Sequence, residues 1–130
     1  MNKEGETAME LPESDIEFLD EKEYQYRLVP NEKGVYLIIS NFPFPEVYAP
    51  READLLINII AGYPNTPVDM FYTNPTIKLV NSGFPNRAAV FQNFDDIVWQ
   101  QWSRHYDWRP GIDNLRTFIS SINNELIKGQ

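Results

Sequence analysis

A length of 130 residues and a hydrophobic content of 42% are typical of one domain with a single core. The absence of cysteine excludes disulfide bonds, thiolate metal sites and a cysteine nucleophile. The net charge is -8, and the nine acidic side chains and two lysines of residues 1–23 account for -7 of it, so the rest of the chain is nearly neutral and lacks the basic face that nucleic acid binding needs.

The chain begins with an acidic segment that precedes the first predicted helix. Residues 1–13 are expected to form a flexible, solvated N-terminus, and residues 14–130 a single domain. No apolar run approaches the roughly 18 residues of a membrane span, and the N-terminal residues lack the apolar core of a signal peptide. We therefore expect a cytoplasmic protein with no membrane partner.

Local signals predict a short helix followed by an antiparallel hairpin. Ser14 and Glu17 have the spacing of a capping box, which predicts a helix that ends near Glu21. Residues 23–29 and 35–40 are rich in β-branched and aromatic side chains, and turn-forming residues separate the two segments. These segments are therefore expected to pair.

The rest of the chain is predicted to contain two more strands, an irregular region and a C-terminal helix. The strands are expected at residues 53–60 and 68–73. Residues 74–96 contain turn residues and no sustained period, which is typical of a binding loop or lid. Apolar residues three and four positions apart then predict a helix with one buried face, beginning near Pro110 and Gly111. Its apolar residues are Ile112, Leu115, Phe118, Ile119, Ile122 and Leu126.

This order of elements predicts the fold class. Strands precede the main helix instead of alternating with helices, which indicates an α+β domain with an N-terminal helix, a four-stranded antiparallel meander and a C-terminal helix. The chain has no glycine-rich phosphate loop, which disfavours a nucleotide-binding fold. We expect neither a metal nor a cofactor.

Residues 99–111 (WQQWSRHYDWRPG) contain all three tryptophans and the only histidine of the chain. A tryptophan ring buries on the order of 200 Å² of mostly apolar surface, so packing is the favoured interpretation of Trp108. Trp99 and Trp102 have the spacing of an aromatic face on a short helix. Trp102 could equally join Arg104 in an exposed aromatic and arginine patch, which is typical of a protein-binding hot spot.

Ser103 and His105, in the same segment, keep a catalytic alternative open. A neighbouring imidazole is what a serine nucleophile needs as a base. Residues two apart share a face on a strand, but they point about 200° apart on a helix. The other interpretation of His105 is a surface or hydrogen-bonded loop residue. Arg104 and Arg109 are candidates to stack on the nearby rings or to pair with Asp107.

Two motifs resemble those of the ubiquitin-conjugating enzyme (UBC) superfamily. Residues 62–73 (GYPNTPVDMFYT) resemble its tyrosine-proline-x-x-proline passage, and the tryptophan, arginine and proline before the last helix resemble its tryptophan-x-proline motif. The similarity is closest to prokaryotic UBC family E, extends over roughly residues 14–126, and implies a UBC-like domain. The motif residues are Tyr63, Pro64, Pro67, Trp108 and Pro110.

The resemblance also implies where site residues would lie. In a typical member the catalytic cysteine precedes the motif tryptophan by eight residues, and this count leads to Gln100. The segment 84–86 resembles the family's histidine-proline-asparagine motif with phenylalanine in place of the histidine, which implies Asn86 as a candidate support for an oxyanion. Partner contacts are expected at Gln100, Trp102 and Arg104, and any catalytic chemistry at Ser103 and His105.

The implied function is bacterial ubiquitin-like modification, with a ubiquitin-like protein and a ThiF-type activating protein as partners. A thioester carrier needs a thiolate, so the missing cysteine indicates a non-catalytic relative, a hydroxyl nucleophile or an engineered removal. The similarity of WQQWSRH to the bacterial branch disfavours the last. We expect a non-covalent binding module, or alternatively an enzyme that carries the ubiquitin-like C-terminus as an oxyester on Ser103. A third alternative is a protein that shares the fold and recognises another peptide.

Overall fold

The structure, a computed structural model, describes residues 10–81 and 83–129. The flexible character expected for residues 1–9 falls outside these described residues. The elements follow one another as α1 (Glu13–Glu21), β1 (Tyr26–Asn31), β2 (Gly34–Pro43), β3 (Tyr48–Ala49), β4 (Glu52–Ile60), β5 (Phe71–Asn74), β6 (Lys78–Leu79), β7 (Val90–Phe94), β8 (Ile97–Trp102) and α2 (Leu115–Ile127).

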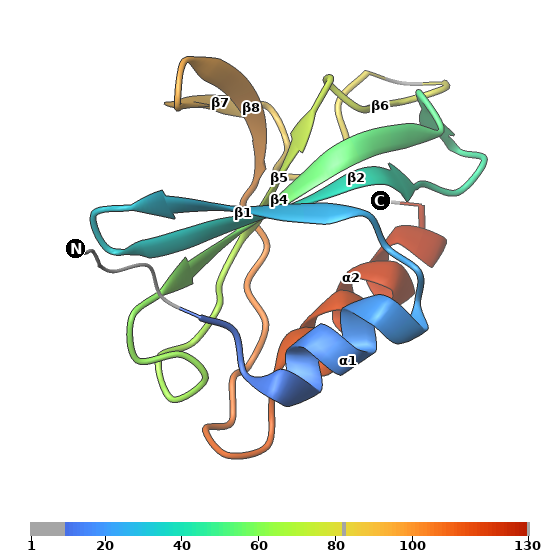
Figure 1. Ribbon diagram of the computed structural model, residues 1–130. Coiled ribbons are helices and arrows are strands. Elements are labelled where there is room, and N and C mark those ends of the chain that lie inside the picture. Colours follow the sequence, from blue (N-terminus) through green and yellow to red (C-terminus); the bar gives the residue numbers. More distant parts are fainter. Residues whose placement is uncertain (1–9, 82, 130) are drawn as a thin grey trace.

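Six strands form one sheet in the order β1-β2-β4-β5-β8-β7, in which all neighbours are antiparallel. A small second sheet pairs β3 with β6. Both helices lie on the same side of the large sheet (Figure 1). Of the helices in the described residues, neither is long and apolar enough to cross a membrane. The predicted α+β class with N-terminal and C-terminal helices is confirmed, but the sheet has six strands instead of four. It also departs from a simple meander, because β8 lies between β5 and β7.

The N-terminal helix and the first hairpin lie where the sequence predicts them. β1 and β2 form the predicted antiparallel pair. α1 ends at Glu21 as predicted, but its N-cap residue is Pro12, and no side chain hydrogen-bonds at the cap. The predicted capping box is wrong, because Ser14 lies inside the first helical turn. Leu11 is buried, so the packed part of the chain begins before residue 14.

The β7–β8 hairpin occupies a region for which the sequence predicted an irregular segment and a short helix. Its turn residues Asp95 and Asp96 have φ angles of 55° and 65°, left-handed values that aspartate tolerates. Trp99 and Trp102 point to opposite faces of β8 and are buried in separate clusters. Because both faces of this strand are covered, it shows no clear alternation of apolar and polar residues, and the predicted helix is wrong.

The C-terminal helix begins later than predicted. The side chain of its N-cap residue Asn114 accepts a hydrogen bond from the Thr117 amide, and the Thr117 hydroxyl accepts one from the Asn114 amide. This capping box places the start of α2 at Leu115. Ile112 therefore lies outside the helix and is 60% exposed. The remaining predicted apolar positions are buried as expected: Leu115, Phe118, Ile119, Ile122 and Leu126.

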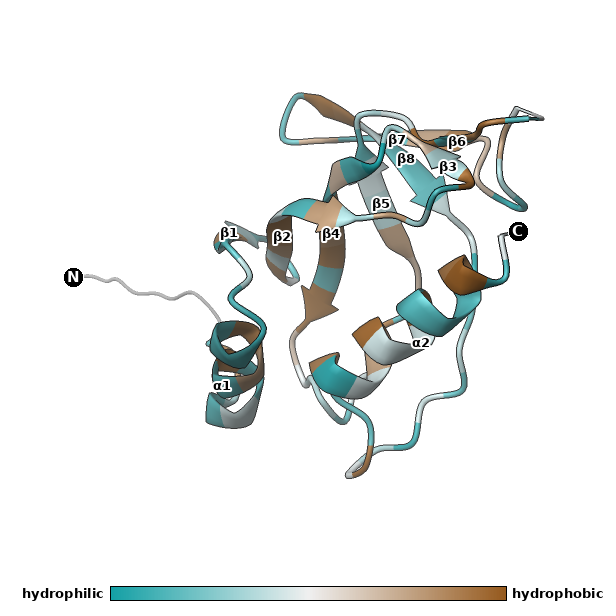
Figure 2. Ribbon diagram, turned by 90° about the vertical axis from the view of Figure 1, so that its right-hand side faces the viewer, coloured by the Kyte–Doolittle hydropathy of each residue, from teal (hydrophilic) through white to brown (hydrophobic). Residues whose placement is uncertain are grey.

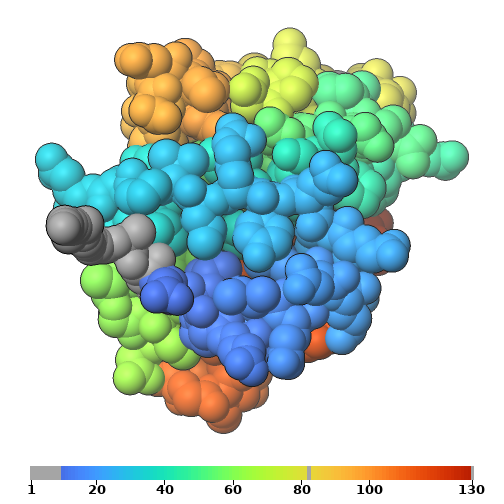
Figure 3. All heavy atoms as spheres, in the orientation of Figure 1, coloured from blue at the N-terminus to red at the C-terminus, as the bar shows by residue number. Residues whose placement is uncertain are grey.

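Two hydrophobic clusters lie on opposite faces of the large sheet. The main core fills the space between the sheet and the two helices, where α2 crosses the sheet (Figure 2). From the α1 side, α1 and the first two strands hide most of α2 (Figure 3). The smaller cluster, on the outer face, consists of Ile38, Leu56, Tyr72 and Trp99, with Phe94 from the β7–β8 hairpin packed against it.

Candidate functional site

The two sequence motifs contact each other in the structure. Trp108 Nε1 donates a hydrogen bond to the Pro64 carbonyl oxygen at 2.8 Å, and the ring centroids of Trp108 and Tyr63 lie 6.0 Å apart. Trp108 is half-buried at this contact, whereas Pro67 and Pro110 are exposed. The loop before β5 is thereby joined to the segment before α2.

A buried carboxylate attaches α1 to the same region. The Tyr63 hydroxyl donates to Asp15 Oδ2 at 2.6 Å, and the Leu115 amide donates to Asp15 Oδ1 at 3.3 Å. Burial raises the pKa of Asp15, and the two hydrogen bonds act in the opposite direction. Burial, together with the hydrogen bond to Asp15, raises the pKa of Tyr63. One side chain of α1 thus holds the start of α2 next to the motif contact.

Gln100 occupies the position at which the motif spacing predicts the catalytic cysteine. It is a buried residue of β8 and is only 1% exposed. Its Oε1 accepts hydrogen bonds from the Thr73 hydroxyl at 2.8 Å and from the Ile77 amide at 2.7 Å. Its Nε2 donates to the carbonyl oxygens of Ile77 at 2.9 Å and Ala88 at 2.8 Å. The side-chain amide therefore uses its full hydrogen-bonding capacity inside the protein.

Trp102 and Arg104 are also buried, in contrast to the binding surface expected from the sequence. Trp102 stacks on Phe71 with ring centroids 5.1 Å apart and donates from Nε1 to the Thr73 hydroxyl at 2.9 Å. The Arg104 guanidinium lies 4.8 Å from the centre of the Trp102 ring and pairs with Glu125 at 3.1 Å. These contacts hold β8 against α2. The Trp102 and Gln100 side chains are therefore enclosed by the protein, and the Arg104 guanidinium is held by Glu125.

Arg104 also fixes the backbone of the segment that contains Asn86. Its Nε and Nη2 donate to the Asn86 carbonyl oxygen at 3.2 and 3.0 Å. The Tyr106 hydroxyl donates to Glu125 at 2.9 Å, and burial together with this hydrogen bond raises the pKa of Tyr106. Asn86 is exposed, and its role as a support for an oxyanion stays a prediction.

The second arginine of the segment, Arg109, forms an ion pair with Asp113 at 3.1 Å. The Asp113 carboxylate also accepts a hydrogen bond from the Arg109 backbone amide at 2.7 Å. The side-chain hydrogen bond from Arg109 lowers the pKa of Asp113 to about 2. This pair stabilises the turn that leads into α2.

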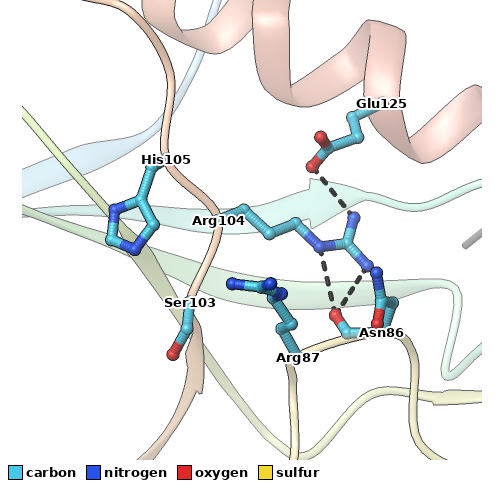
Figure 4. Close-up of a pocket in the computed structure, with 6 residues that line it drawn as sticks. All are labelled: Asn86, Arg87, Ser103, Arg104, His105 and Glu125. Atoms are coloured by element: carbon cyan, nitrogen blue, oxygen red, sulfur yellow. Dashed lines mark hydrogen bonds and ion pairs between the residues drawn. The ribbon is translucent and has the colours of Figure 1, made fainter.

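Ser103 and His105 line one cavity of about 290 Å³ beside the buried arginine (Figure 4). Ser103 Oγ accepts a hydrogen bond from Gln101 Nε2 at 2.7 Å, and His105 Nδ1 lies 2.7 Å from Asp69 Oδ1. Within residues 10–81 and 83–129, no hydrogen bond joins Ser103 to His105. The residues that line the cavity are Asn86, Arg87, Ser103, Arg104, His105 and Glu125.

Asp69 and Arg87 belong to this region, although the sequence did not single them out. Asp69 lies in the tyrosine-proline motif segment, 36 positions before His105, and only the fold brings the two side chains together. Arg87 directly follows segment 84–86, and this adjacency was the available signal. The Ser103 amide donates to the Arg87 carbonyl oxygen at 2.9 Å, which holds these two residues side by side.

Comparison with known proteins identifies the family. The profile described as Prokaryotic E2 family E matches residues 11–129, which is nearly the whole chain. No curated protein and no solved structure matches. The described residues contain no group of three or more side chains that could hold a metal ion. With its UBC-like fold, the chain therefore belongs to prokaryotic E2 family E and is a cysteine-free E2-like protein of a prokaryotic ubiquitin-like pathway.

Proposed function

We propose that this E2-like protein binds a ubiquitin-like protein, its ThiF-type activating partner, or both, without forming a covalent bond. The observation that carries this proposal is that Gln100 is buried and fully hydrogen-bonded. Position 100 is where the motif spacing predicts a nucleophile, and the chain has a buried side-chain amide with four hydrogen bonds there. Such a side chain offers neither a thiolate nor access for a carbonyl group. The proposal places the interaction in the cytoplasm.

The hydrogen bonds of Gln100 also give this position a structural role that requires no nucleophile. They connect β8 to Ile77 and Ala88, which lie on two other segments. Unpaired buried polar groups cost roughly 1–3 kcal/mol each, so these bonds are a structural reason to keep glutamine. The outer surfaces of the sheet and helices do not depend on a thiol, and they remain available to a partner.

A second function, carriage of the ubiquitin-like C-terminus as an oxyester on Ser103, is supported by the pair of Asp69 and His105. With Nδ1 next to Asp69, the other ring nitrogen of His105 would accept the hydroxyl proton. Ser103 Oγ would attack the activated C-terminal carbonyl carbon, and the bond to the activating group would break with its electrons on that group. Asn86 would support the oxyanion. This function ranks second because Ser103 and His105 share a cavity without a hydrogen bond.

The two functions differ in whether a bond forms. The protein is mixed with the ubiquitin-like protein, the ThiF-type protein and ATP, and is then examined by size-exclusion chromatography and intact mass. We expect co-elution with no increase in mass. An adduct with the mass of one ubiquitin-like protein less one water, released by mild base and absent from Ser103→Ala, would overturn the non-covalent function and support the oxyester.

Matched variants separate these outcomes from damage to the fold. Ser120→Ala changes an exposed serine of α2 and is expected to behave as the unmodified protein. In His105→Ala the proposed base is absent, so no oxyester would form. If the protein binds neither partner, both functions are overturned, and recognition of another peptide remains as the role of the fold.

A further inference from the structure

The guanidinium of Arg87 lines the same cavity as Ser103 and His105, and within residues 10–81 and 83–129 this positive charge has no side-chain partner. The neighbouring Arg104 is engaged by Glu125 and by a backbone carbonyl. Arg87, by contrast, makes no side-chain hydrogen bond or ion pair with any residue that the structure describes. In Figure 4 its guanidinium points toward Ser103 and His105, on the side away from Glu125.

The carboxylates closest to the cavity have other partners. Glu125 accepts hydrogen bonds from Arg104 and from the Tyr106 hydroxyl. Asp69 lies against His105 Nδ1 at 2.7 Å. Neither carboxylate forms an ion pair with Arg87 in the described part of the chain. Among the residues that line the cavity, Arg87 and Arg104 against Glu125 leave one net positive charge, although the chain as a whole carries -8.

The remaining polar groups of the cavity suit an anion of small size. The Ser103 oxygen already accepts a hydrogen bond from Gln101, so its hydroxyl proton is left to donate. The exposed Asn86 side chain adds amide donors. A guanidinium binds a planar carboxylate through two parallel hydrogen bonds. The 290 Å³ cavity holds about ten waters at about 30 Å³ each, which is room for a chain end but not for a folded surface.

We propose that this cavity binds the free C-terminal carboxylate of an extended peptide tail, with Arg87 as its ion-pair partner. The inference rests on the proposed function, and the tail is that of the ubiquitin-like protein. A tail that is held as an ester or thioester has lost its negative charge, whereas an unactivated tail keeps it. Arg87 therefore favours the unactivated tail, which agrees with non-covalent binding and disfavours carriage on Ser103.

A pair of peptides tests the charge requirement. The probe is an acetylated hexapeptide that ends in Gly-Gly, prepared either with a free C-terminal carboxylate or with a C-terminal amide, and titrated into the full chain by NMR. The carboxylate form is expected to bind at least tenfold more tightly, to shift the Arg87 Nε–H and Ser103 amide signals, and to weaken as salt is added. Equal affinity for the two peptides would overturn the inference.

Charge-matched variants test the assignment to one side chain. Arg87→Gln is expected to remove the tenfold preference, and Arg27→Gln, which changes an exposed arginine on β1 at the far edge of the sheet, is expected to keep it. Arg87 has a φ angle of 56°, so Arg87→Asn provides a second variant whose residue type tolerates left-handed backbone. A preference that survives in both Arg87 variants would contradict the assignment. So would displacement of the peptide by an equal concentration of inorganic phosphate, since this would indicate a general anion site.

The intact ubiquitin-like protein separates failure of the inference from failure of the proposed function. If it binds equally with a free or amidated C-terminus, and Arg87→Gln has no effect, the carboxylate site is refuted and the proposed function stands. If neither it nor the ThiF-type protein binds, while the free-carboxylate peptide binds through Arg87, the proposed function is refuted and the carboxylate site stands.

Discussion

The indole Nε1 of Trp108 donates a hydrogen bond to the backbone carbonyl oxygen of Pro64 at 2.8 Å. The two residues lie 44 positions apart, and each belongs to one of the two motifs by which the sequence resembles UBC proteins. An indole N–H has only a donor to satisfy, and a loop carbonyl has only an acceptor, so each supplies what the other lacks. The contact gives a physical reason for the two motifs to occur together.

Replacement of this tryptophan tests that reason. Trp108→Phe keeps a ring next to Tyr63 but removes the hydrogen bond to the Pro64 carbonyl, and we expect it to lower the free energy of unfolding by about 1–2 kcal/mol. The measurement is urea denaturation at neutral pH. Ile112→Ala, at a side chain that is 60% exposed, is the control and should change stability by less than about 0.5 kcal/mol. Equal effects of the two variants would contradict this account.

The buried position of Gln100 predicts that a cysteine placed there does not restore a carrier. Gln100→Cys removes a side chain that pairs with Thr73, Ile77 and Ala88, so we expect a loss of about 3 kcal/mol or more in the free energy of unfolding. In the native state the new thiol should react with iodoacetamide far more slowly than the thiol of Ser103→Cys, which is partly exposed. Comparable labelling rates, measured by intact mass, would show that position 100 is accessible.

The β7–β8 hairpin is attached to the outer face of the sheet by Phe94. Its ring stacks on Tyr36 with centroids 5.2 Å apart and meets the edge of Tyr72 at 5.0 Å. Phe94→Ala should therefore lower the free energy of unfolding by about 2–3 kcal/mol and speed hydrogen exchange of the β7 and β8 amides. Phe91→Ala, on the same strand but exposed, should have a much smaller effect. Unchanged exchange in Phe94→Ala would indicate that other contacts hold the hairpin.

The ion pair of Arg109 and Asp113 predicts a contribution to stability that is lost in acid. The pKa of Asp113 is lowered from 3.8 to about 2, mainly by the side-chain hydrogen bond from Arg109. Because the folded-state pKa is the lower one, Asp113 stabilises the fold above about pH 3.8, and this contribution disappears as the pH falls toward 2. In Arg109→Gln the pKa of Asp113 should rise toward its ordinary value, as measured by NMR titration, while the pKa of Asp15 should not change. No shift at Asp113 would refute the assigned cause.

The sequence determined the elements whose pattern is visible locally. The C-terminal helix was predictable because only one of its faces is buried, so apolar residues recur every three or four positions. The first hairpin was predictable from two strand-forming segments around a turn. The absence of a thiol nucleophile also required no structure, since the chain has no cysteine. The start of α2 was missed because the Asn114 cap, and not Pro110, sets it.

Tertiary structure decided everything that depends on segments far apart in the chain. β8 was missed because Trp99 and Trp102 are buried on its two opposite faces, and a strand covered on both sides shows no alternation. The burial of Gln100 and the approach of Asp69 to His105 both depend on loops packed against the end of β8. Sequence spacing therefore located the region of the site. Only packing decided which side chains are enclosed and which reach the cavity, because enclosure depends on neighbours that local sequence does not specify.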